Sequence, residues 1–234
     1  MSRNPAPAAG AIILAAGPPA SDHGFDAAWA SAAGRPILAW AAEACVRAPD
    51  VAAVVLVVRP DQLDAAGKLV AHSGWHGVHA VAATSPRRRD AVRVGLAALP
   101  TDVGWVIVHD GARPLVTPEL IAAGLAAAVG TGAAAAWAPV NETLKRVEGG
   151  VVTATVPRAE LALVQTPQVF RRALLLAAHD AAPADLDPPD DATLAQHAGI
   201  PVALYPAGAD NLKVVDALDL AVAAALLAAR ILPD

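Results

Sequence analysis

The sequence predicts an α/β protein built on a three-layer, mostly parallel sheet. Apolar runs such as Val51–Val58 and Val106–Val108 are continuous, which is typical of strands buried on both faces of a parallel sheet. Segments with apolar residues at helical spacing separate these runs, and this alternation indicates right-handed β-α-β connections. Hydrophobic residues make up 56% of the chain and aromatics only 3%, so alanine, valine and leucine form the apolar excess. This composition favours helices packed on a β-branched sheet.

The elements follow one another in a regular order. The strands are expected at residues 11–17, 51–58, 78–81, 106–110, 133–139 and 202–205. The helices are expected at residues 37–46, 61–72, from Arg87 onward, 117–129, 170–179, 190–199 and 218–232. Small residues after the first strand allow backbone amides to approach phosphate.

Residues 140–156 alternate around Gly149-Gly150, which is a hairpin signature. We expect an arm that projects from the sheet and pairs with a second subunit. Residues 165–168 are expected to lead into the helix at 170–179, and residues 181–191 to form a loop. The prediction is one domain over residues 1–234, with a dimerisation arm at about 140–158.

Composition excludes several classes of function. Seventeen basic against 22 acidic side chains give a net charge of -5, too acidic for a general nucleic-acid binder. No stretch approaches the roughly 20 apolar residues that span a bilayer, so we expect no membrane partner. The single cysteine, Cys45, can form no intrachain disulfide, which fits a cytoplasmic protein, and we expect it in the core.

The stretch Val106–Pro114 delivers polar residues at the end of a buried strand. Asp110 and Arg113 would lie at the carboxyl edge of the sheet, where open α/β sheets bind ligands. A carboxylate and a guanidinium fixed by Pro114 suit a phosphorylated substrate, with or without a metal. The alternative is a turn in which Asp110 caps the next helix and pairs with Arg113.

Two charged clusters have structural interpretations. The basic run at residues 87–93 is typical of a solvated helix face, at least for Arg87 and Arg93. The pair Asp190-Asp191 is expected to cap the helix that ends before Gly199 rather than to bind a metal.

Several separated motifs coincide in one order. They are Leu14-Ala-Ala-Gly17, Gly34-Arg-Pro36, His109-Asp-Gly-Ala-Arg-Pro114, Pro139-Val-Asn-Glu-Thr-Leu-Lys145, Arg158, Gln165-Thr-Pro-Gln-Val-Phe170, Asp190-Asp-Ala192 and Asn211-Leu-Lys-Val214. From about residue 11 to 227 the series resembles the 2-C-methyl-D-erythritol 4-phosphate cytidylyltransferases of non-mevalonate isoprenoid biosynthesis. The resemblance implies a Rossmann-like nucleotidyltransferase fold, a homodimer, and transfer of CMP from CTP to the polyol phosphate with release of pyrophosphate.

The resemblance also implies roles for individual residues. The acceptor would be held by Asp110, Arg113, Thr143, Arg158 and Lys213, with Asp110, Arg113 and Lys213 nearest the chemistry and Arg158 reaching across the dimer. Lys145 and Gln168 would support the fold and the arm. The nucleotide side would comprise Ala15, Ala16, Gly17, Thr84, Ser85, Arg88 and Ala91. Mg²⁺ is the implied cofactor, because joining two polyanions requires positioning and positive charge.

The chain departs from the family pattern in two places. Residues 14–34 contain no lysine or arginine, although the family has two cations there; its lysine position falls on Ala28. This segment instead offers Asp22, His23 and Asp26, and candidates to replace the lost cations are His23, Arg35 and Arg87. Thr84-Ser85 occupies the position of a Gly-Gly pair, and Ala91 that of a serine.

Two other functions stay open on these departures. The altered base pocket favours a nucleotidyltransferase of the same fold that acts on another polyol phosphate or another nucleotide. The missing cations favour a non-catalytic paralogue that binds a phosphorylated ligand or pairs with an active subunit.

Overall fold

The computed structural model describes residues 8–17, 25–208 and 210–231. Its centre is a seven-stranded sheet in the order β11-β7-β10-β6-β1-β4-β5. The bounds are β1 Ala9–Ala15, β4 Val51–Val58, β5 Val78–Ala82, β6 Trp105–Asp110, β7 Ala133–Pro139, β10 Ala162–Arg171 and β11 Ala203–Pro206. Neighbouring strands are parallel except at β10, which runs antiparallel to both β6 and β7. The predicted mostly parallel α/β sheet is confirmed.

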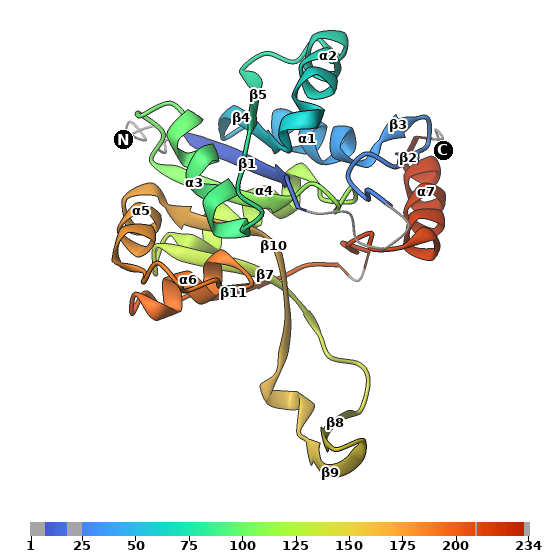
Figure 1. Cartoon of the computed structure of the whole chain (residues 1–234), viewed down its shortest axis with the longest axis vertical. Coiled ribbons are helices and arrows are strands. Elements are labelled where there is room, and N and C mark those ends of the chain that lie inside the picture. Colours follow the sequence, from blue (N-terminus) through green and yellow to red (C-terminus); the bar gives the residue numbers. More distant parts are fainter. Residues whose placement is uncertain (1–7, 18–24, 209, 232–234) are drawn as a thin grey trace, which may run out of the picture.

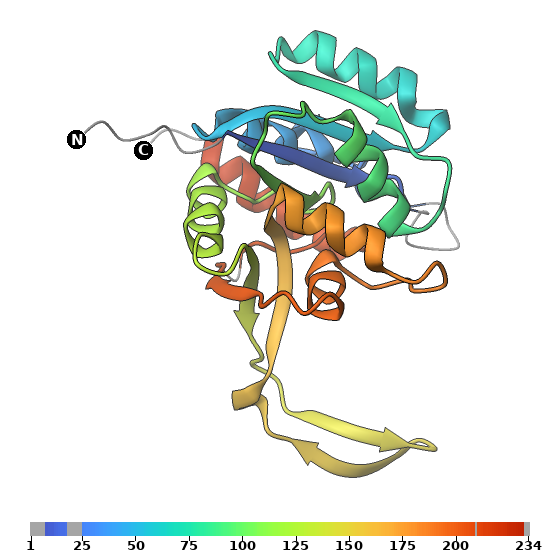
Figure 2. The same cartoon turned by 90° about the vertical axis from the view of Figure 1, so that its left-hand side faces the viewer.

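Helices cover both faces of this sheet (Figures 1 and 2). One core cluster joins one face to α1 Ile37–Arg47, α2 Leu63–Ser73 and α4 Pro118–Ala128. The opposite face packs on α3 Arg88–Ala98, α5 Arg172–Ala181 and α6 Asp191–His197. Alternate residues of β1 divide between the two clusters, because successive side chains of a strand point to opposite faces. The three-layer prediction therefore holds.

The remaining elements are short or lie beside the sheet. A small hairpin, β2 Ser31–Ala32 and β3 Arg35–Pro36, turns at Gly34. Single 3₁₀ turns occupy Pro60–Gln62 and Arg158–Glu160. The last helix, α7 Ala217–Ile231, buries Ala223 and Leu227 in a third cluster, in accord with the predicted docking helix. No helix in the described ranges has the length and apolarity that crossing a membrane requires.

The helix predicted at 170–179 is present as α5, two residues later than expected, but the strand that precedes it was missed. Residues 165–168 lie inside β10, and α5 begins only at Arg172. A proline within a run argues against a central strand, because it cannot donate to the ladder. Here the register on β7 shifts between Gln165 and Gln168, so Thr166 and Pro167 need no partner on that side. The Tyr205 hydroxyl donates to the Pro167 carbonyl at 2.6 Å instead.

The predicted hairpin arm is present as β8 Leu144–Glu148 and β9 Val151–Val156. Its turn is Gly149-Gly150, where both residues have positive φ (56° and 80°), a backbone conformation that favours glycine. Figures 1 and 2 show the arm extending well away from the sheet and its helices. Lys145 Nζ donates to Thr155 Oγ1 at 2.7 Å across the hairpin, as a supporting residue should.

The arginine run of α3 is less solvated than predicted. Arg87 and Arg89 donate to backbone carbonyls of the loop 183–186, and Arg89 is buried. Arg93 pairs with Asp180 at 3.3 Å and stays half exposed. The sequence pattern missed this because the acceptors lie some 90 residues away. The predicted cap at Asp190 is present, since its side chain accepts from Thr193 N at 2.8 Å. Cys45 is in the core as expected, and burial raises the pKa of its thiol to about 12.

Candidate active site

A cavity of about 400 Å³ lies at the carboxyl edge of the sheet. Its walls come from the ends of β1 and β6, the loop before α3 and the segment before α7. The lining residues are Leu14, Ala15, Ala16, Gly17, Asp26, Ala27, Ala28, Ser85, Pro86, Arg87, Arg88, Ala91, Asp110, Ala112, Lys213, Val214 and Val215. This edge is where ligands bind in open α/β sheets.

Close backbone contacts bring these segments together. Gly111 N donates to Leu14 O at 2.8 Å, and a Cβ at Gly111 would lie 2.9 Å from that oxygen, so only glycine permits this approach. Val214 N donates to Ala112 O at 2.9 Å and holds the Lys213 segment against the loop after β6. The sequence from Asp110 to Arg113 is thereby fixed on two sides.

Asp110 is the centre of a charged group at the cavity. Its Oδ2 lies 3.0 Å from Lys213 Nζ and 3.6 Å from Arg113 Nε. Burial alone raises the pKa of this carboxyl, but Lys213, Arg88 and Arg113 outweigh burial and lower the pKa to about 2. Asp110 is therefore an ionised acceptor at neutral pH. The next helix is capped by Thr117 and not by Asp110, whereas the predicted pairing with Arg113 is present.

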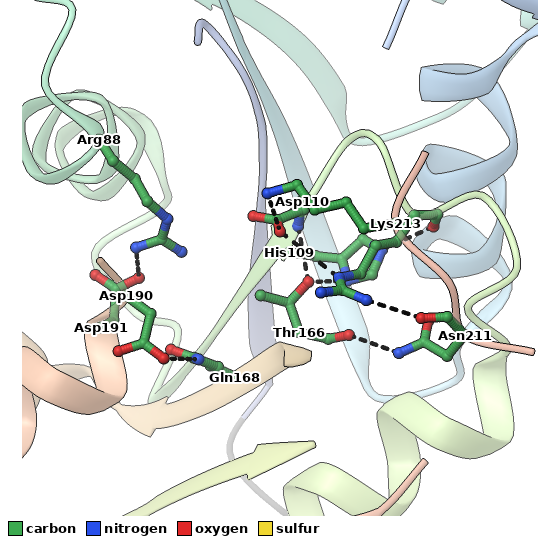
Figure 3. A network of polar contacts seen from close by, with 10 residues as sticks. Arg88, His109, Asp110, Thr166, Gln168, Asp190, Asp191, Asn211 and Lys213 are labelled. Carbon is green, nitrogen blue, oxygen red and sulfur yellow. Dashed lines mark hydrogen bonds and ion pairs between the residues drawn. The ribbon is translucent and has the colours of Figure 1, made fainter. Parts of the chain in front are cut away.

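A buried network behind Asp110 orients it, as Figure 3 shows. Thr166 Oγ1 accepts from Asp110 N at 3.0 Å and lies 3.1 Å from His109 Nδ1. Arg113 O can only accept, so His109 carries its proton on Nε2 and donates it to that carbonyl at 3.1 Å. Nδ1 of the neutral ring then accepts from the Thr166 hydroxyl. Burial lowers the pKa of His109 to about 4, which agrees with a neutral ring.

Arg113 is anchored rather than open to the cavity. Its side chain is 11% exposed, and its Nη1 donates to Asn211 O at 2.8 Å. Asn211 Nδ2 in turn donates to Gln165 Oε1 and Thr166 O, which ties the Lys213 segment to β10. Burial lowers the pKa of Arg113. Arg113 does not appear among the cavity-lining residues, so its predicted contact with the acceptor stays a prediction.

Arg88 brings a second guanidinium to the cavity from the start of α3. Its Nη1 donates to the buried Asp191 at 2.6 Å, while its buried Nη2 has no hydrogen-bond partner within the described part of the chain. Burial opposes its charge, but Asp191 and Asp110 prevail and raise its pKa. The neighbouring Gln168 donates to Asp190 (Figure 3). It also accepts from Ala192 N, which fixes α6 beside the site, so Gln168 is structural as predicted.

The residues predicted for the nucleotide side all line the cavity, with one exception. Ala15, Ala16, Gly17, Arg88 and Ala91 line the cavity, as does Ser85; Thr84 is exposed and does not. The Ser85 hydroxyl donates to Asp90 Oδ2 at 2.5 Å and accepts from Arg87 N, so it is already engaged by its own loop.

Two predicted acceptor residues lie elsewhere. Thr143 and Arg158 are exposed at the base of the arm and do not line the cavity of their own chain. Arg158 donates to the Asn141 carbonyl. Their predicted role therefore requires a partner subunit.

The expected replacements for the loop cations fare differently. The prediction that Arg35 replaces a loop cation is wrong, because Arg35 pairs with Glu43, lies over the Trp40 ring at 4.7 Å and lines a separate cavity. Arg87 does line the site. His23 and Asp22 fall outside the described residues. Sequence reasoning missed Arg59, which follows β4 and reaches Asp26; its place just after a buried strand at the carboxyl edge was the available signal.

Across residues 8–17, 25–208 and 210–231, no three or more His, Cys, Asp and Glu side chains gather as they would around a metal ion. Both carboxylates that line the cavity already face cations: Asp110 faces Lys213, and Asp26 faces Arg59. Three cationic side chains, Arg87, Arg88 and Lys213, line the same cavity.

A mostly parallel sheet whose carboxyl edge carries a cation-lined cavity defines the class: a Rossmann-like α/β protein with its ligand site at that edge. Within that class, residues 9–229 match the 2-C-methyl-D-erythritol 4-phosphate cytidylyltransferase family, and the chain belongs to this family. The resemblance that the separated motifs indicated is thus confirmed.

Individual relatives agree. The chain is 37% identical over 219 residues to the 2-C-methyl-D-erythritol 4-phosphate cytidylyltransferase of Dehalococcoides mccartyi (strain CBDB1), covering 93% of this chain and 95% of that protein. It is 41% identical to the bifunctional enzyme IspD/IspF of Solidesulfovibrio magneticus but spans only 55% of that longer protein. The crystal structure of the 2-C-methyl-D-erythritol 4-phosphate cytidylyltransferase from Thermus thermophilus matches with a TM-score of 0.73 at 33% identity, over 94% of this chain and 98% of that one.

Proposed function

We propose that this protein transfers CMP from CTP to 2-C-methyl-D-erythritol 4-phosphate and releases pyrophosphate, in non-mevalonate isoprenoid biosynthesis. The observation that carries the proposal is that residues from both halves of the expected site line one cavity. The Asp110–Lys213 pair of the acceptor side and Ala15–Gly17, Ser85 and Arg88 of the nucleotide side share its walls. The family match over residues 9–229 supports the same reaction.

The chemistry requires positioning and charge rather than a nucleophilic side chain. An oxygen of the acceptor phosphate attacks the α-phosphorus of CTP, and the bond from that phosphorus to the pyrophosphate oxygen breaks. The attacking oxygen is already ionised, so no general base is needed. Lys213, half exposed beside Asp110, would stabilise the negative charge of the transferred phosphate. The ionised Asp110 would accept from acceptor hydroxyls, in an orientation set by Thr166 and His109.

Mg²⁺ enters this proposal with the nucleotide, as MgCTP. Mg²⁺ is commonly bound through substrate phosphates and few protein carboxylates. The engagement of Asp26 and Asp110 by Arg59 and Lys213 supports delivery of the ion on the triphosphate. Activity should disappear with a chelator and return with added Mg²⁺. The place of action in this proposal is the cytoplasm, in keeping with the buried, unpaired Cys45.

The active form in this proposal is a homodimer built through the arm. Val147, Val151 and Val152 are 55–66% exposed on the hairpin, as apolar side chains that await a partner would be. Pairing would also bring Arg158 of one subunit to the other subunit's cavity. Sedimentation at micromolar concentration should give a dimer, and Val151→Asp together with Val152→Asp should give monomers with little activity. A wild-type monomer that turns over normally would contradict the dimer.

One observation favours a different nucleotide. The cavity wall carries Ala91 without a hydroxyl, and the Ser85 hydroxyl is already bonded to Asp90. The direct experiment measures pyrophosphate release with the polyol phosphate, Mg²⁺ and each of the four nucleoside triphosphates. Faster release with CTP supports the proposal, whereas faster release with another triphosphate would make that triphosphate the substrate in place of CTP. No pyrophosphate release with any of the four, in protein that still binds the polyol phosphate, would indicate the non-catalytic paralogue.

A further inference from the structure

Asp26 gives the nucleotide side of the cavity an electrostatic problem. It lines the cavity together with Gly17 and Ala28, and residues 14–34 contain no lysine or arginine. An uncompensated carboxylate at this wall would repel a triphosphate, because like charges at short range in a partly buried site are strongly unfavourable. Asp110, the other lining carboxylate, already faces Lys213.

Arg59 meets this carboxylate directly. Its Nη1 lies 2.8 Å from Asp26 Oδ2 and donates to Gly17 O at 3.2 Å. Gln62 Nε2 donates to the same Asp26 oxygen at 2.6 Å. The Arg59 and Asp26 side chains are 23% and 22% exposed. The other neighbour of Arg59 is Asp61, 3.3 Å away but 70% exposed, so solvent screens it more.

The sheet explains how a distant residue reaches the loop. In the parallel pair of β1 and β4, Ala15 is opposite Val58, so Arg59 leaves the sheet beside Ala16 and Gly17. From there its guanidinium contacts a residue on each side of 18–24, namely Gly17 and Asp26. A cation from the end of β4 thus stands where the loop after β1 supplies none of its own.

We propose that Arg59 is the positioning residue of the nucleotide side: it cancels the charge of Asp26, so that nucleotide phosphates can occupy that wall of the cavity. The proposal rests on the proposed function and names the residue that compensates for the cation-free loop. Arg59 acts through Asp26 and Gly17 and need not touch the substrate.

A purely structural role makes a different forecast. If the pair only anchored the loop, loss of either partner would weaken nucleotide binding. If charge is what matters, the two partners have opposite effects. Asp26→Asn keeps the shape and an oxygen that accepts from Arg59 and Gln62, yet removes the negative charge and leaves Arg59 as net positive charge at the cavity.

The test compares Arg59→Gln, Asp26→Asn, the double variant and Arg47→Gln by calorimetry at low salt, with MgCTP and with inorganic tripolyphosphate as probes. Arg47 is a matched control, since it is 72% exposed and its ion pair with Glu43, 3.9 Å long, lies outside the cavity. We expect Arg59→Gln to weaken binding of both probes about tenfold, the order expected for one unit charge near a polyanion. Asp26→Asn should bind as tightly as wild type or more tightly, and the double variant should return to near the wild-type value.

Weakening by Asp26→Asn as large as that by Arg59→Gln, in variants with wild-type thermal unfolding, would overturn the proposal in favour of anchoring. If Arg59→Gln fails to fold, Asp26→Asn alone still separates charge compensation from anchoring, because this substitution removes only the charge of Asp26. The tripolyphosphate probe separates this inference from the reaction. If the variants show the expected order of affinities with tripolyphosphate but the protein binds MgCTP no more tightly than tripolyphosphate, the role of Arg59 stands and the cytidylyl transfer is refuted. Failure of the wild type to bind either probe would overturn both.

Discussion

Replacement of His109 by glutamine should remove much of the acid sensitivity of the fold. His109 is fully buried, accepts from Thr166 and donates to the Arg113 carbonyl, and it is therefore held neutral. Its pKa falls from an ordinary 6.5 to about 4 on folding, and burial is the main cause. Between those two values the unfolded chain binds a proton that the folded chain does not. Stability from this group is thus complete above pH 6.5 and is lost as the pH falls toward 4.

The magnitude follows from the pKa difference. One pKa unit corresponds to about 1.4 kcal/mol, so the full effect is about 3 kcal/mol, of which about 2 kcal/mol is lost between pH 7 and pH 5. Asp110, with its pKa lowered to about 2, adds a second loss only below about pH 4, because its ionised form is favoured by folding. The interval between pH 7 and pH 5 therefore separates the effect of His109 from that of Asp110.

The assay is urea unfolding of wild type and His109→Gln at pH 7, 6 and 5. The variant starts less stable at pH 7, since glutamine fills the site imperfectly, but its free energy of unfolding should fall by about 2 kcal/mol less over the interval. The exposed His76 is the matched control, and His76→Gln should keep the wild-type slope. A His109→Gln variant that loses as much stability as wild type between pH 7 and pH 5 would refute the buried, neutral histidine.

Three further changes test the site and the packing. Lys213→Met should lower kcat about 100-fold to 1,000-fold in the pyrophosphate assay, because it removes a cation 3.0 Å from Asp110; an unchanged kcat would exclude it from the reacting centre. Gly124→Ala should destabilise the fold by about 1–3 kcal/mol in urea unfolding, since its Cβ would lie 2.6 Å from the Tyr205 hydroxyl oxygen; full stability would contradict that packing. Ala28→Lys should tighten CTP binding measured by calorimetry, because Ala28 lines the cavity, and no gain in folded protein would count against placing the family's lysine there.

Local patterns alone determined much of this protein. The strand 51–58 and the strand 133–139 have the predicted bounds, because an unbroken apolar run can only be a doubly buried strand or helix and its length selects the strand. Gly149-Gly150 placed the hairpin turn, and Asp190 placed a helix cap. Asp110 was placed at the cavity by strand direction, since it ends a strand at the carboxyl edge of the sheet, whereas Lys213 was placed there only by the family resemblance.

Only the tertiary structure decided the rest. β10 contains Pro167, which is unusual for a central strand, and the register shift that accommodates this proline exists only against β7. The basic run of α3 finds its acceptors about 90 residues away, which no window of sequence reveals. Arg59 and Asp26 are 33 residues apart and meet because β1 and β4 are neighbours. Short-range propensity is written in the chain itself, whereas charge compensation depends on which strand ends the fold places side by side.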